Sequence, residues 1–184
     1  WQRVKDRMFR ICTVAKEKNI GVLVDAEESW IQDPIDRLTI EMMEIFNEEK
    51  PIVYNTLQLY RYDRLDFLKL SHRIALQQKF ILGVKLVRGA YMEKERSRAA
   101  AKGVRSPIQP NKQHTDEDYD AAIDFCINNI QNVACIIATH NEKSNLLAVD
   151  LAEKKDIPVY NSHLHFSQLY GMSDNLTFNL AKSG

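Results

Sequence analysis

A lysine inside an apolar, β-branched segment is the first feature of this sequence that suggests chemistry. Lys85 lies in the middle of the stretch GVKLVRGAY, residues 83–91. Burial of a charged amine is unfavourable unless an opposite charge or a ligand pairs with it. Two explanations therefore stand side by side: Lys85 forms an internal ion pair with Asp25 that has no chemical role, or it faces an anionic or electron-rich ligand. The small pair Gly89 and Ala90 favours a ligand, because it permits close approach to the backbone.

Polar and ionisable side chains also follow each of the other apolar segments. Those at the ends of the five segments are Asp25, Glu27 and Glu28; Thr56, Gln58 and Tyr60; Lys85, Arg88 and Tyr91; Thr139, His140 and Asn141; and His165, Ser167 and Gln168. The carboxyl ends of parallel strands build the active site of a barrel enzyme. Strand ends near water also collect polar residues without any function, and this alternative stays open. The two-residue period of a strand predicts that Lys85, Asp25 and Gln58 point inward.

The elements that must position these residues alternate along the chain. Strands are predicted at 20–28, 51–60, from residue 83, at 132–141 and at 162–172. Helices are predicted at 1–18, 33–46, 64–78, 113–130 and 142–155. Asp33 is the expected N-cap of the second helix, with Pro34 at its first position. Thr115 is the expected cap of the fourth helix, with Asp118 at the acidic position of a capping box.

This alternation predicts an α/β fold with parallel strands covered by helices. The sequence contains no GxGxxG motif, so a dinucleotide-type doubly wound sheet lacks its best support. An incomplete (β/α)8 TIM-like barrel of about five parallel strands fits better, since a whole barrel needs about 250 residues. We expect residues 1–184 to form a single domain that starts on a helix and stops within a βα unit. Residues 92–114 are expected to be an insertion loop, in which the charged part at 93–105 forms a solvated helix and loop.

Composition excludes several classes of protein. Lys plus Arg and Asp plus Glu both count 25, so the formal net charge is zero and nothing indicates a nucleic-acid partner. No apolar run approaches the roughly 18 residues that span a bilayer, and the first ten residues, WQRVKDRMFR, do not resemble a signal peptide. Cys12, Cys126 and Cys135 are unclustered, which predicts buried thiols in a reducing compartment rather than disulfides or a zinc site.

Six segments together resemble one family. VDAEE, NTLQLY, VKLVRGAY, TDEDY, ATHNE and SQLYGMSDNLTF occur in the order and spacing typical of proline dehydrogenases, and the likeness runs from about residue 20 to the end of the chain. It is strongest to the monofunctional, mitochondrial-type branch. The resemblance implies a (β/α)8 barrel that binds FAD, oxidises L-proline to Δ1-pyrroline-5-carboxylate and passes the electrons to a membrane quinone.

The resemblance also implies roles for individual residues. By position, Lys85 matches a basic residue near flavin N5, and Gln58 matches an amide at the isoalloxazine edge. The rest of the implied cofactor site is Val87, Gly89 and Ala90 through their backbone, and Thr139, His140 and Asn141 along the ribityl, pyrophosphate and adenine side. The implied substrate site is Asp25, Tyr91 and Leu169. The implied catalytic set is Lys85, Asp25 and Tyr91, with no metal ligand.

The chain departs from the family pattern at both ends. It lacks a lysine on the first barrel strand, the last strand, and the helix whose arginines and glutamate hold the proline carboxylate. We therefore expect the isolated chain to bind proline poorly and to bind FAD weakly or not at all, with its open apolar wall covered by oligomerisation or by a rearranged helix. Peripheral association with a membrane fits a quinone acceptor. The expected location is the bacterial cytoplasm, including the surface of the inner membrane, or the mitochondrial matrix.

Three other functions remain open on the residues alone. A Schiff-base aldolase carries its lysine on a barrel strand, as Lys85 is predicted to be. A metal-dependent barrel hydrolase is suggested by His163 and His165, with Asp25 and His140 as further ligands. A non-catalytic barrel fragment, used only for binding, is the third possibility.

Overall fold

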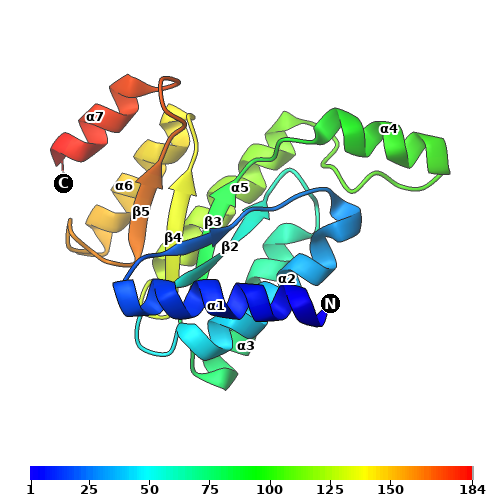
Figure 1. Cartoon of the computed structure of the whole chain (residues 1–184). Coiled ribbons are helices and arrows are strands. Elements are labelled where there is room, and N and C mark those ends of the chain that lie inside the picture. Colours follow the sequence, from blue (N-terminus) through cyan, green and yellow to red (C-terminus); the bar gives the residue numbers. More distant parts are fainter. Residues whose placement is uncertain (184) are drawn as a thin grey trace.

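The computed structural model describes residues 1–183, in which strands and helices alternate (Figure 1). The strands are β1 (Val22–Val24), β2 (Val53–Gln58), β3 (Leu82–Val87), β4 (Val133–Ala138) and β5 (Leu164–Ser167). The helices are α1 (Gln2–Lys18), α2 (Ser29–Phe46), α3 (Arg64–Gln78), α4 (Met92–Lys102), α5 (Lys112–Asn128), α6 (Glu142–Lys154) and α7 (Asp174–Ser183).

The five strands form one parallel sheet whose spatial order follows the chain, β1-β2-β3-β4-β5. The register sets Thr56 of β2 beside Lys85 of β3, and Lys85 beside Ile136 of β4. In Figure 1, α3 and α5 lie behind the middle strands, on one side of the curled sheet. Sequential parallel order with covering helices is the arrangement of a barrel wall. The predicted α/β fold, an incomplete (β/α)8 barrel with five parallel strands, is therefore confirmed.

Side chains alternate between a helix-packed face of the sheet and an open face. Val84 and Leu86 of β3 belong to the main hydrophobic core, which also includes residues of the helices. Lys85, between them, faces the opposite side, together with Thr56 and Gln58 of β2. The inward orientation that the strand period predicts for Lys85 is thus the one the structure has.

Helices α2 and α5 begin earlier than predicted. Helix α2 starts at Ser29, so Asp33 is not its N-cap and Pro34 lies inside the helix. Pro34, the sixth residue of the helix, has no amide hydrogen to donate to the Trp30 carbonyl oxygen, so one hydrogen bond of the helix is missing there. Helix α5 is capped by Asn111, whose side chain accepts a hydrogen bond from the His114 amide. Asparagine is at least as good a cap as threonine, and this displaces Thr115 into the first turn.

The segment 92–114, expected as an inserted loop, begins with an ordered helix. Helix α4 ends at Lys102 and is followed by Gly103, which takes the left-handed conformation (φ 62°) typical of a helix C-cap. One side of α4 is buried through Glu95 and Ala99, so the helix is only partly solvated. The chain then returns to the turn that follows β2, where Ile108 forms an isolated antiparallel β-bridge with Arg61.

The last predicted strand is shorter than the pattern indicated. Strand β5 ends at Ser167, and a turn at Gly171, with φ of 76°, leads into α7. The three cysteines are free and buried, as predicted. Within residues 1–183, no helix combines the length and the apolar content needed to cross a membrane.

Candidate functional site

A groove of about 630 Å³ lies on the open face of the sheet, at the carboxyl ends of the strands. Every residue that was predicted for the site lines it: Asp25, Gln58, Lys85, Val87, Gly89, Ala90, Tyr91, Thr139, His140, Asn141 and Leu169. They lie at the carboxyl ends of all five strands or in the turns that follow them. Convergence of distant polar residues in one concave site is the usual geometry of a binding or active site.

Lys85 and Asp25 form an ion pair in this groove. The lysine side chain is 17% exposed, and the carboxylate of Asp25 is 74% exposed. The partner proposed from the sequence is therefore present, but its exposure leaves the carboxylate accessible to a ligand. An exposed pair of this kind contributes little to stability. The pair therefore fixes the lysine on the open face without being a buried structural element.

Thr56, the strand neighbour of Lys85, carries an unpaired hydroxyl. The residue is 4% exposed, and its Oγ1 finds no hydrogen-bond partner among residues 1–183. Buried hydroxyl groups nearly always have a partner, because desolvation without one is costly. Since Thr56 lines the groove, its free hydroxyl points to a ligand that completes the hydrogen bond.

Gln58 ties two turns of the groove together. Its Nε2 donates to the carbonyl oxygen of Glu27 at 2.8 Å, and its Oε1 accepts from the amide of Ala90 at 3.3 Å. An amide group has a second donor hydrogen and a second acceptor lone pair, so contact with a ligand edge remains available. Gln58 therefore connects the β1–α2 turn with the β3–α4 turn from the floor of the groove.

Tyr91 makes a second connection between the same turns. Its hydroxyl donates a hydrogen bond to Glu27 Oε2 at 2.8 Å. This bond, together with partial burial and the nearby acidic side chains, raises the pKa of Tyr91 above its ordinary value. The phenol thus stays protonated and is held in place beside Asp25.

Arg88 organises the other end of the groove and was given no role from the sequence. Its guanidinium donates to Asp116 at 2.7 Å, to Thr139 at 2.8 Å and to Ser144 at 3.0 Å. It also stacks 4.3 Å from the ring centre of Tyr119. The guanidinium therefore fixes the turn after β4, which carries the predicted residues 139–141. A charged residue at a strand end, followed by glycine, was the available sequence signal.

The residues of the β4–α6 turn are held from both sides. The Asn141 side chain caps α6 by accepting from the Ser144 amide, and the Asn141 amide donates to Thr139 Oγ1. His140 Nε2 accepts a hydrogen bond from the Leu169 amide at 3.0 Å. This contact brings the turn after β5 onto the turn after β4.

Glycine is required at position 89 for a different reason from the one that the sequence suggested. Its φ of 142° is unfavourable for other residues, and an added Cβ would lie 2.5 Å from the ring of Tyr60. The missing side chain therefore makes room for Tyr60 of the protein itself. The explanation by close approach of a ligand is not needed at this position.

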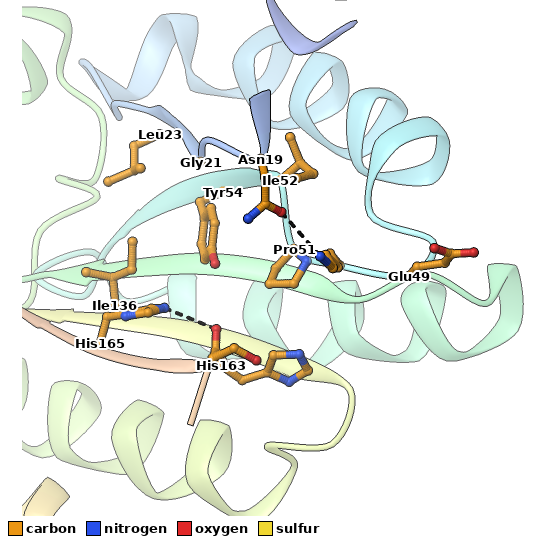
Figure 2. Close-up of a pocket in the computed structure, with 12 residues that line it drawn as sticks. Asn19, Gly21, Leu23, Glu49, Pro51, Ile52, Tyr54, Ile136, His163 and His165 are labelled. Carbon is orange, nitrogen blue, oxygen red and sulfur yellow. Dashed lines mark hydrogen bonds between the residues drawn. The ribbon is translucent and has the colours of Figure 1, made fainter. Parts of the chain in front are cut away.

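A second hollow lies on the same face, at the amino ends of the strands (Figure 2). Tyr54 and Ile136 form part of its wall, and His163 and His165 lie at one side. His163 Nδ1 lies 2.7 Å from the Ile130 carbonyl oxygen, and His165 Nε2 lies 3.1 Å from that of Ser162. Contacts with backbone carbonyl oxygens thus account for the positions of both histidine rings.

The ligand set suggested for a metal-dependent hydrolase is not brought together. His163 and His165 line the second hollow, whereas Asp25 and His140 line the groove at the opposite ends of the strands. In the described part of the chain, no group of three or more His, Cys, Asp or Glu side chains is arranged to hold a metal ion. The strand period placed the two histidines on one face, but the length of the strands separates them from Asp25 and His140.

Comparison with known proteins gives one consistent result. A family model described as Proline dehydrogenase matches residues 2–184. The chain is 38% identical over 181 residues to mitochondrial proline dehydrogenase 1 of Dictyostelium discoideum, covering 95% of the chain and 31% of that protein. It is 35% identical to the human mitochondrial proline dehydrogenase 1, covering 99% of the chain and 31% of that protein.

Bacterial proteins are similar as well. Carbapenem antibiotics biosynthesis protein CarD of Pectobacterium carotovorum is 37% identical, over 100% of the chain and 46% of that protein. A solved structure of proline utilization A from Bdellovibrio bacteriovorus, inactivated by N-propargylglycine, superposes with a TM-score of 0.91 at 25% identity, covering 99% of the chain and 19% of that one. The chain thus spans less than half the length of these relatives, and it belongs to the proline dehydrogenase family.

Proposed function

We propose that this chain forms the flavin- and substrate-binding wall of an enzyme that oxidises L-proline to Δ1-pyrroline-5-carboxylate with FAD as the cofactor. The observation that carries the proposal is the groove, where Lys85, Asp25, Gln58 and Tyr91 converge from three strand ends in a chain of this family. The activity belongs to the whole protein, because the chain spans about a third of the length of the mitochondrial relatives.

The residues of the groove fit a flavin on two counts. The unpaired hydroxyl of Thr56 needs a hydrogen-bond partner on the open face, next to the cation of Lys85. The turn that holds Thr139, His140 and Asn141 leads directly into the amino end of α6, an environment that favours phosphate groups. Under this proposal, Lys85 and Gln58 hold the ring system, while residues 139–141 hold the ribityl and pyrophosphate side. Val87, Gly89 and Ala90 line the ring through their backbone.

The chemistry that FAD supplies when bound is acceptance of a hydride equivalent from the ring carbon beside the proline nitrogen. Lys85 provides a fixed positive charge on the floor of the groove, held by Asp25. Such a preorganised charge stabilises negative charge that develops during the reaction. Under this proposal, the exposed carboxylate of Asp25 orients the amine of the substrate, and Tyr91, fixed by Glu27, and Leu169 line the same groove.

The proposal also includes the electron acceptor and the cellular location of the enzyme. A quinone in a membrane is the expected acceptor, reached through peripheral association of the enzyme with the bilayer. The names of the relatives support a mitochondrial location for some members, and CarD supports a bacterial one. Large apolar side chains near the groove and on α7, such as Leu169, Tyr170 and Phe178, are more than half exposed and suit association with further protein. Alone, this chain is expected to bind proline poorly.

The test uses the full-length protein that contains this chain. We expect it to purify with bound flavin, visible in its absorbance spectrum, and to reduce an artificial dye when proline is added. Lys85→Met should lower this rate by at least about a hundredfold, the size of effect seen when a preorganised charge is removed from an active site. Lys69→Met, on the exposed side of α3, is the matched control and should leave the rate unchanged. A full-length protein without flavin or proline-dependent dye reduction would contradict the proposal.

A further inference from the structure

We propose that Glu95 is a positioning residue for the substrate side of the groove: it clamps the β1–α2 turn, which carries Asp25 and Glu27, onto the β3–α4 turn, which carries Tyr91. This inference rests on the proposed function and adds a residue to it. Glu95 belongs to α4, outside the sheet, and is not among the residues that line the groove in the described chain.

Glu95 is a buried carboxylate with both oxygens engaged by one residue. It is 2% exposed. Its Oε1 accepts from the Ser29 amide at 2.5 Å, and its Oε2 accepts from the Ser29 hydroxyl at 2.7 Å. Burial of a carboxylate is unfavourable unless hydrogen bonds of this kind compensate for the lost water. The contact joins positions 66 residues apart in the sequence.

The carboxylate acts as the cap of α2. Ser29 is the first residue of that helix, and the N-cap residue, Glu28, makes no capping bond with its own side chain. The first amides of a helix need acceptors from outside it. Glu95 supplies one and also places negative charge at the positive end of the helix dipole. The start of α2, and hence the turn before it, is thus fixed by a residue of α4.

Three further contacts join the same two segments. Tyr91 donates to Glu27, Gln58 bridges Glu27 to Ala90, and Lys94 pairs with Glu28. The groove-facing bonds hold Glu27 directly. Glu95 holds the backbone two residues further on, so it limits where Glu27 and Asp25 can lie relative to Tyr91.

The clamp is separate from the anchoring of α2 in the fold. Met42, Met43 and Phe46 of α2 belong to the hydrophobic core, and Asp36 pairs with Arg64 of α3. Loss of the Glu95 contact should therefore loosen the first turn of α2 while the helix stays in place.

The experiment compares Glu95→Ala and Glu95→Gln in the full-length, flavin-loaded enzyme. We expect the KM for proline to rise about tenfold in Glu95→Ala, the loss typical of a hydrogen-bonded charge, with flavin content unchanged. Glu95→Gln keeps one acceptor oxygen and should recover part of the loss. Ser29→Ala combined with Glu95→Ala should be no worse than Glu95→Ala alone, because both changes break the same contact.

A second measurement, made without substrate, accompanies the kinetic one. Hydrogen exchange of the amides in residues 26–32 should become faster in Glu95→Ala than in the wild type. Two controls lie on the same helix. Glu93→Gln changes an exposed carboxylate and should alter neither readout. Ala99→Gly weakens α4 at a buried position without touching the clamp, and should lower thermal stability while leaving the KM unchanged.

Two results would overturn the inference. In the first, Glu95→Ala leaves both the KM and the exchange of residues 26–32 at wild-type values. In the second, Ala99→Gly raises the KM as much as Glu95→Ala does, which would assign the effect to the stability of α4. If the wild-type enzyme does not oxidise proline, the proposed function fails, and the exchange measurement alone decides the clamp.

Discussion

The two faces of the sheet use the same strands for opposite purposes. On the helix-packed face, Val84 and Leu86 are almost completely buried among apolar side chains. On the open face, one residue away, Lys85 carries a charge and Thr56 has an unpaired hydroxyl. The first arrangement stabilises the fold through apolar burial, whereas the second lowers stability and fits the ligand site proposed for this face. Substitutions on the two faces should therefore separate stability from function.

The largest loss of stability is expected from a buried ion pair behind the sheet. Arg64 donates to Asp36 at 2.7 Å, both side chains are 7% exposed, and Asp36 also accepts from Asn55 and Gln32. Asp36→Asn removes the buried one of the two carboxylates that pair with Arg64, the other being Asp63 at 2.6 Å, so we expect a loss of about 3–4 kcal/mol in the free energy of unfolding. Denaturant titration measures it.

The pair on the open face is the matched control for Asp36→Asn. Because the carboxylate of Asp25 is largely exposed, Asp25→Asn should cost less than about 1 kcal/mol. Equal losses from Asp25→Asn and Asp36→Asn would contradict the distinction between the two faces.

The next effect comes from the apolar side of β3. Leu86 is fully buried, so Leu86→Ala should lower the free energy of unfolding by about 3 kcal/mol through lost burial and the cavity left behind. Lys85→Met, at the adjacent position, is expected to leave the free energy within about 1 kcal/mol of the wild type. A larger loss from Lys85→Met than from Leu86→Ala would mean that the lysine is part of the core.

Thr56→Val should raise stability while weakening ligand binding. Valine has nearly the same shape and removes the unpaired hydroxyl, so we expect a gain of about 1 kcal/mol in the free energy of unfolding without flavin. The same change should weaken flavin binding in the full-length protein, measured by titration of the apoprotein. A loss of stability would show that the hydroxyl has a partner inside the protein.

The smallest effect is a pH dependence on the helix-packed side. His72 is buried against the ring of Phe125, its Nε2 has no partner within residues 1–183, and burial lowers its pKa. The folded state therefore binds the proton less readily than the unfolded chain, and stability should fall as the pH drops through about 6.5. His72→Leu should remove part of this decline between pH 7.5 and 5.5. An unchanged slope would contradict the assignment.

The sequence pattern predicted on which face of the sheet each strand residue lies, because side chains alternate strictly and Lys85 interrupts an apolar run. The convergence of the site residues could be predicted from the family motifs and from the rule that parallel strands end at one edge of the sheet. The features that the sequence pattern did not predict depend on contacts between residues far apart in the chain. Helix α2 starts at Ser29 because Glu95 caps it from another element, and Gly89 is required by Tyr60. Neither partner can be identified from local sequence.

The central claim is that Lys85 faces a flavin on the open side of the sheet. The most direct test is the midpoint potential of the flavin in the full-length protein and in its Lys85→Met variant. Removal of a positive charge beside the ring disfavours the reduced, more negative cofactor, so the potential should fall by about 30 mV or more, equivalent to a tenfold change in the reduction equilibrium. An unchanged potential in a flavin-loaded Lys85→Met variant would contradict the account.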